Sequence, residues 1–145
     1  MKKIYLIILL FFAFVFLSCS NQLVKATVWS GTIEIDDKDY DLEAYFKSDY
    51  TMKVFIELPD SNGKRITAKG SYNITSNYQF YSKVRGESDI DDDDSEDPFK
   101  IEFSGTLNVY TGYGDGDYEE TVRYTGGAGD VDTDGDWKLK KINSY

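Results

Sequence analysis

Apolar and polar side chains alternate along most of the chain, and this alternation constrains the fold more than any other feature of the sequence. In Thr27–Ile35, for example, Trp29 and Ile33 share one face of an extended chain, while Ser30 and Glu34 share the other. A period of two puts successive side chains on opposite faces of a β-strand. Each such segment is therefore expected to bury one face and to expose the other to water.

The pattern recurs in eight segments, separated by connections rich in Asp, Gly, Asn and Ser. Sequential antiparallel strands with one apolar face can close on themselves, which removes the exposed edges. The sequence therefore predicts an all-β fold, an eight-stranded up-and-down meander that closes into a small barrel. A two-sheet β-sandwich has the same pattern and stays open as the alternative. The expected strands cover 27–35, 39–47, 50–58, 65–74, 78–84, 99–110, 118–124 and 137–142.

The N-terminus has the parts of a secretory signal. Lys2 and Lys3 supply positive charge, Ile4–Leu17 is an apolar run, and Ser18 precedes Cys19, the only cysteine. The run has 14 residues, whereas a spanning helix needs roughly 18 to 20. A cleaved or retained export signal is therefore expected here, and the segment is left out of the fold.

This segment resembles the lipobox of bacterial lipoproteins, with Phe16 where leucine is usual. In that family a peptidase cleaves before a cysteine that carries a diacyl group, and several acyl chains give stable anchoring. An ordinary signal peptide, or an uncleaved anchor with an incidental cysteine, is the alternative. The resemblance implies lipidation at Cys19, with residues 1–18 as signal peptide, 19–26 as lipidated tether and 27–145 as a single barrel domain. It also implies an exported protein anchored in a bacterial membrane, at the outer membrane or the cell surface.

The composition excludes many kinds of site. The chain has no histidine and, apart from Cys19, no thiol. These absences exclude a Ser-His-Asp triad, a Cys-His dyad and most transition-metal sites. A net charge of −10 disfavours nucleic acid as a partner. We therefore expect no enzymatic activity and no binding to nucleic acid.

The first and last expected strands carry a second resemblance. Trp29-Ser30-Gly31 lies in the first strand, and Gly135–Lys141 closes the chain with the order Gly-Asp-Trp-Lys-Leu-Lys-Lys. With the meander between them, this order resembles the lipocalin-like (calycin) barrels found among small bacterial lipoproteins. The resemblance implies an envelope lipoprotein whose barrel binds a small apolar ligand.

Large aromatic residues recur on the expected inner faces. In a ligand-binding barrel they would line a cavity, whereas in a packed barrel they would fill the core. The packed barrel would instead act as a structural or protein-interaction module, presenting an acidic surface to an envelope or host protein. Five small residues on the inner faces are expected to be either tapering positions or places where a large ring crosses the interior: Gly31, Ala44, Ala68, Gly70 and Gly105. The candidate ligand-binding residues are Trp29, Tyr40, Phe46, Tyr72, Phe80, Phe103, Tyr124 and Trp137.

One short motif points to a metal. Residues 130–135 read Asp-Val-Asp-Thr-Asp-Gly, the start of a calcium loop in which alternate carboxylates converge on a hard cation. Lys141 stands where an EF-hand has its bidentate glutamate, so a plain turn rich in Asp and Gly is the alternative. Asp130, Asp132 and Asp134 are the candidate ligands of a weak Ca²⁺ site, and no other cofactor is expected. The acidic run Asp89–Asp97 is a further candidate for loose cation binding or for docking a basic partner.

Overall fold

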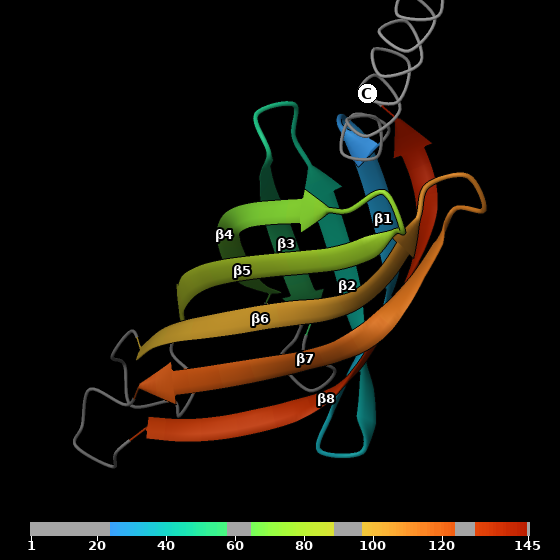
Figure 1. Cartoon of the computed structure of the whole chain (residues 1–145). Coiled ribbons are helices and arrows are strands. Elements are labelled where there is room, and N and C mark those ends of the chain that lie inside the picture. The colour runs from blue at the N-terminus through green and yellow to red at the C-terminus, as the bar shows by residue number, and fades with distance from the viewer. Residues whose placement is uncertain (1–23, 58–64, 89–96, 124–129, 145) are drawn as a thin grey trace, which may run out of the picture.

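Eight strands follow one another around a closed wall, each antiparallel to the next, and β8 returns to pair with β1 (Figure 1). The computed structural model describes residues 24–57, 65–88, 97–123 and 130–144. The predicted all-β meander and its closure into a barrel are confirmed, and the sandwich alternative is wrong. The strands are β1 (Thr27–Ile35), β2 (Lys38–Phe46), β3 (Thr51–Glu57), β4 (Arg65–Ile74), β5 (Gln79–Ser88), β6 (Asp97–Asn108), β7 (Tyr113–Arg123) and β8 (Asp130–Ser144).

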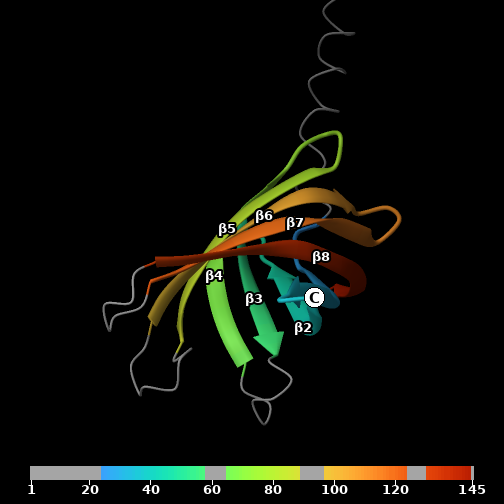
Figure 2. The same cartoon turned by 90° about the horizontal axis from the view of Figure 1, so that it is seen from below.

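The strands form two layers, and the long strand β8 extends beyond its pairing with β1. β5 to β8 run side by side as one broad layer, with β1 to β3 crossing behind it (Figure 1). Figure 2 shows the same wall from below, curling round between these layers. The ladder between β1 and β8 ends where Ile33 lies opposite Trp137. The earlier part of β8, from Asp130 to Asp136, pairs with β7 alone among the described strands.

The alternation in the sequence becomes alternation of burial. In β3, Met52, Val54 and Ile56 are buried, and the residues between them are half-buried. The inner faces of all eight strands join in one hydrophobic core, and burial of apolar surface at about 25 cal/mol per Å² drives its formation. Val24, in the segment expected to be a tether, is also buried in this core. Packing therefore begins three residues before the expected start of the domain at Thr27.

The turn between β1 and β2 is a two-residue hairpin loop. Asp36 and Asp37 have φ angles of 51° and 60°. Positive φ at both central residues matches the right-handed twist of the flanking strands, and aspartate tolerates it better than most residues. The turn expected at these aspartates is confirmed.

The hairpin of β7 and β8 begins and ends elsewhere than the sequence predicted. Residues 111–117 and 126–136 were expected to be connections, yet β7 begins at Tyr113 and β8 at Asp130. The ladder between them is unbroken from Tyr113 opposite Lys140 to Arg123 opposite Asp130. Asp and Gly are poor strand formers, but pairing with a neighbouring strand overrides that weak preference.

Candidate binding sites

Phe46, on β2, occupies the middle of an aromatic cluster inside the barrel. Its ring centroid lies 6.3 Å from that of Trp29, 4.9 Å from Tyr72 and 5.9 Å from Phe80. All three contacts are edge-to-face, the arrangement that aromatic pairs prefer. Phe46 therefore contacts other aromatic rings in the place where an interior ligand would have to lie.

Trp137, on β8, extends this cluster toward β6. Its ring centroid lies 5.4 Å from Phe80 and 6.3 Å from Phe103. The indole N–H donates to two backbone carbonyls, those of Ser104 and Asp117, each at 3.0 Å. The polar atom of a buried tryptophan is thereby satisfied without water or a ligand.

Two glycines make room for this indole. Gly105 on β6 lies opposite Gly116 on β7, and Gly116 lies opposite Trp137. The carbonyls that accept the indole N–H belong to the neighbouring pair, Ser104 and Asp117. A Cβ at Gly105 would lie 2.6 Å from the Cα of Gly116, so no larger residue fits there. Of the two alternatives expected for the small inner residues, the register at Gly105 favours a ring that crosses the interior.

The structure brings most of the candidate ligand-binding residues together as a packed core. Six of them are at most 5% exposed, and their rings form one connected series of contacts. Tyr40 is partly buried and packs against the core, and Tyr124 lies outside the described residues. The six are Trp29, Phe46, Tyr72, Phe80, Phe103 and Trp137.

One carboxyl group occupies an inward position on β7. Glu120 alternates with the buried residues Tyr118 and Val122, and Thr133 Oγ1 on β8 donates to its Oε2 at 3.2 Å. Burial raises the pKa of Glu120, although the hydrogen bond from Thr133 opposes that rise. A hollow of about 390 Å³ lies beside this pair, also lined by Glu119 and Asp132. Glu120 was not predicted from the sequence, because a carboxylate in a strand with alternating polarity is expected to point toward solvent.

The three aspartates of the calcium motif lie in the extended strand β8, not in a tight turn. They occupy alternate positions on one face, where side chains are spaced by roughly 6.5 to 7 Å. Asp130 accepts a 3.3 Å hydrogen bond from Arg123 Nε, while Asp132 and Asp134 lie opposite Thr121 and Glu119. Ca²⁺ needs oxygens within 2.3 to 2.6 Å. Among the described residues, no group of three His, Cys, Asp or Glu is arranged to hold a metal ion.

Cys19 and residues 89–96 of the acidic run lie outside the described residues. Within the described ranges, no helix has the length and apolar character to cross a membrane. Lipidation at Cys19 therefore stays a prediction from the sequence.

Four cations stand side by side on the outer face of the barrel, one on each of β3 to β6. Strand register places Lys53 opposite Lys69, and Lys69 opposite Arg85. Arg85 in turn lies opposite Lys100. We call these four residues the basic row. Strands lie about 4.8 Å apart, and like charges directly opposite one another are destabilising, so the row has an electrostatic cost.

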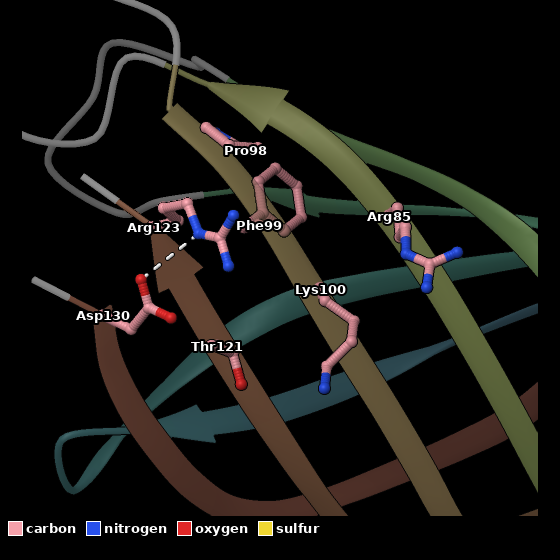
Figure 3. A pocket seen from close by; sticks show the side chains of 7 residues that line it. All are labelled: Arg85, Pro98, Phe99, Lys100, Thr121, Arg123 and Asp130. Carbon is pink, nitrogen blue, oxygen red and sulfur yellow. Dashed lines mark hydrogen bonds and ion pairs between the residues drawn. The ribbon is translucent and has the colours of Figure 1, made fainter. Parts of the chain in front are cut away.

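Two shallow hollows border the basic row, and they share Arg85, Pro98 and Phe99 as lining residues. The first, of about 260 Å³, adds Lys100 and Arg123; Figure 3 shows these side chains around the rings of Pro98 and Phe99. The second hollow, of about 520 Å³, is lined on its other side by β4 and the end of β5. Its further lining residues are Thr67, Lys69, Gly86 and Glu87.

The acidic side chains of the protein neutralise this region only in part. Glu102 lies 2.6 Å from Lys83 Nζ and 3.3 Å from Lys100 Nζ, and these hydrogen bonds, that of Lys83 first, lower its pKa. In the part of the chain that the structure describes, neither Lys69 nor Arg85 has a carboxylate within ion-pair distance. The sequence reasoning missed the row because its members are 15 or 16 residues apart, and only strand register aligns them.

No family model matches the chain, and no curated protein matches it. Among solved structures, the chain is similar to the apo form of intact afifavidin, with 10% identity over 82% of each chain and a TM-score of 0.46. It is similar to apo short afifavidin at 10% identity, over 80% of this chain and 94% of that one, with a TM-score of 0.46. The rhizavidin–biotin complex gives 9% identity, over 80% and 98%, with a TM-score of 0.46. At these values the likenesses assign neither a family nor a ligand to the chain.

Proposed function

We propose that this chain is a non-enzymatic, lipid-anchored module of the bacterial envelope that binds its partner on the outer wall of a packed barrel. The packing of the interior carries the proposal. The rings that could have received a guest contact one another edge to face, and the indole N–H of Trp137 already has two acceptors. A surface partner therefore fits the barrel better than an interior ligand.

The anchoring part of the proposal is supported by the sequence alone. Ser18 and Cys19 follow a positively charged start and an apolar run, the order of a lipoprotein signal. The absence of histidine from the whole chain supports a role outside catalysis, since it removes the commonest general acid and base.

Native mass spectrometry of the full chain, extracted from its membrane in mild detergent, tests both parts. We expect the mass of the processed chain plus acyl groups, with no further guest, and we expect Cys19→Ser to lose the acyl mass. Phe80→Ala is a positive control for interior binding, because a dry apolar cavity left by a large side chain binds small apolar molecules such as benzene. A constant guest mass on the wild type would overturn the packed-barrel part, and an unmodified N-terminus would overturn the anchor.

The second candidate function is the binding of a small polar ligand on the wall that β7 and β8 form. The observation that favours it is the inward pair of Glu120 and Thr133, which lines a hollow of about 390 Å³. All six residues that line this hollow are polar or charged, so a ligand there would be oriented by hydrogen bonds and not by apolar contacts. A small ligand that binds the wild type, is lost in Glu120→Ala and is kept in Glu87→Ala, a change at an exposed glutamate outside this hollow, would decide for this candidate.

A further inference from the structure

The basic row is an exception on a strongly acidic protein. The chain has 26 acidic and 16 basic residues, yet four of the basic residues stand in direct register across four strands. An aspartate or glutamate at any of these positions would replace a repulsion with an attraction. An arrangement that costs stability, where relief is so easily available, indicates a ligand that supplies the negative charge that the described residues around the row do not.

The row forms a track that suits an elongated ligand. It crosses β3 to β6 at right angles, and with strands about 4.8 Å apart it extends over roughly 14 Å. Arg85, Pro98 and Phe99 line both hollows. Phe99 is only 2% exposed, so the exposed Pro98 supplies most of the apolar surface there. A ligand in this place would meet cations at regular intervals and an apolar surface next to them.

The lining of the hollows is mixed, and this identifies the chemistry of the ligand. Besides the cations it contains the hydroxyls of Thr67 and Thr121 and the carboxylates of Glu87 and Asp130. Carboxylates repel a bare oxyanion, but they accept hydrogen bonds from hydroxyl groups. The exposed ring of Pro98 suits the C–H face of a sugar. A ligand with anionic groups, many hydroxyls and an apolar face satisfies all of these groups together.

We propose that the outer wall of the barrel, along Lys53, Lys69, Arg85 and Lys100, binds a linear acidic saccharide that carries carboxylate or sulfate groups. This inference rests on the proposed function, because it requires that the partner bind outside the barrel. The acidic remainder of the chain repels such a polymer at long range. Binding is therefore expected to depend on these cations and to weaken steeply with salt.

The test compares two double variants with the same change in net charge. Lys69→Glu with Arg85→Glu removes the centre of the row. Lys138→Glu with Lys140→Glu alters exposed cations on the outer face of β8 instead. The first variant replaces like-charge neighbours of Lys53 and Lys100 by opposite charges, so it should fold at least as stably as the wild type. Circular dichroism and thermal unfolding check that both variants are folded.

Isothermal titration of the full chain in neutral detergent measures binding to a heparin oligosaccharide and to an oligogalacturonate, with neutral dextran and sodium sulfate as references. We expect at least one acidic oligosaccharide to bind. We expect the β4–β5 variant to weaken that binding tenfold or more, and the β8 variant to change it less than twofold. The references should not bind.

Four results would overturn the inference. The first is that neither oligosaccharide binds, and the second is that both variants weaken binding equally. The third is that sulfate binds as tightly as the oligosaccharide. The fourth is that micelles containing phosphatidylglycerol displace the oligosaccharide, which would assign the row to a lipid surface. None of these results bears on the mass of the purified chain. Failure here is therefore distinguishable from failure of the packed, lipid-anchored barrel.

Discussion

The phenol of Tyr118 on β7 donates a 2.7 Å hydrogen bond to the backbone carbonyl of Glu34 on β1, 84 residues earlier in the chain. The ladder between β1 and β8 ends one residue before, at Ile33 opposite Trp137. A side chain from β7 thus reaches past β8 to hold β1 where backbone pairing stops. Gly135, on the intervening strand, permits this reach, since a Cβ there would lie 2.9 Å from the Tyr118 ring.

Tyr118→Phe should therefore loosen the closure of the barrel. The ring stays, but the carbonyl of Glu34 loses its donor, at an expected cost of about 1 to 3 kcal/mol in the free energy of unfolding. Urea denaturation followed by tryptophan fluorescence measures this, because both tryptophans are buried. The matched control is Tyr81→Phe, at a phenol that is 64% exposed, and it should change stability by less than about 0.5 kcal/mol. Equal effects at the two tyrosines would contradict the bracing role.

Gly105→Ala should destabilise the barrel more than any change at the surface. The backbone there has φ of +149°, and a Cβ would lie 2.2 Å from the carbonyl oxygen of Asp115. The added methyl group would collide with the backbone of β7, and forcing β6 and β7 apart is expected to cost about 3 kcal/mol or more. Thermal unfolding measures the loss, and Thr106→Ala, one residue further along β6 at an exposed site, is the control. A melting temperature within a few degrees of the wild type would show that the contact between β6 and β7 does not require glycine at this position.

Glu120→Gln should stabilise the protein at neutral pH but not in acid. Burial raises the pKa of Glu120 in the folded chain above its unfolded value of about 4.3. The folded state then holds the proton more tightly, so its stability falls as the pH rises from the unfolded to the folded pKa. Glutamine mimics the protonated form and keeps an oxygen for Thr133.

Melting temperatures of the wild type and Glu120→Gln should therefore agree near pH 4 and diverge by pH 7, with the variant higher. Glu119→Gln makes the same change in net charge at a neighbouring exposed carboxylate, and its difference from the wild type should vary much less with pH. If the two variants behave alike across the range, Glu120 is not in a desolvated position.

We expect that Ca²⁺ does not bind at the three aspartates of β8. In an extended strand Asp130, Asp132 and Asp134 cannot turn three carboxylates toward one cation. Titration calorimetry with Ca²⁺ is expected to give no saturable heat for the wild type or for Asp132→Ala. Saturable heat in the wild type that vanishes in the variant would restore the calcium site.

The fold could be predicted from the sequence because a period of two leaves one choice of buried face for each strand. That is why Met52, Val54 and Ile56 could be assigned to the inner face without a structure. The end of a strand is a weaker signal, and β8 begins at Asp130 because β7 supplies a partner for aspartates that otherwise favour turns. The spacing of aspartates predicts a calcium loop only where the segment forms a tight turn. Here pairing with β7 holds the segment extended, so the aspartates do not converge.

The candidate sites were harder to predict, because they depend on register. Arg85 and Lys100 become neighbours only when β5 and β6 are aligned, and the intervening sequence does not fix that alignment. The aromatic residues, by contrast, were expected inside, but the sequence could not decide between lining a cavity and filling a core. The decisive fact is spatial: the rings of Phe80 and Trp137 meet at 5.4 Å across two glycines.

The closure of the barrel by its last strand has a consequence for the order of events during biosynthesis. β1 has β2 as its neighbour early, but its second neighbour is made only at the end of the chain. Trp137 and the carbonyls that accept its N–H come together only then. Until β8 has been made, the wall cannot close over its apolar face, and non-local pairing of this kind is slow. A chain exported through a channel that admits only unfolded polypeptide would gain from this delay, since the barrel cannot close before its last strand is made.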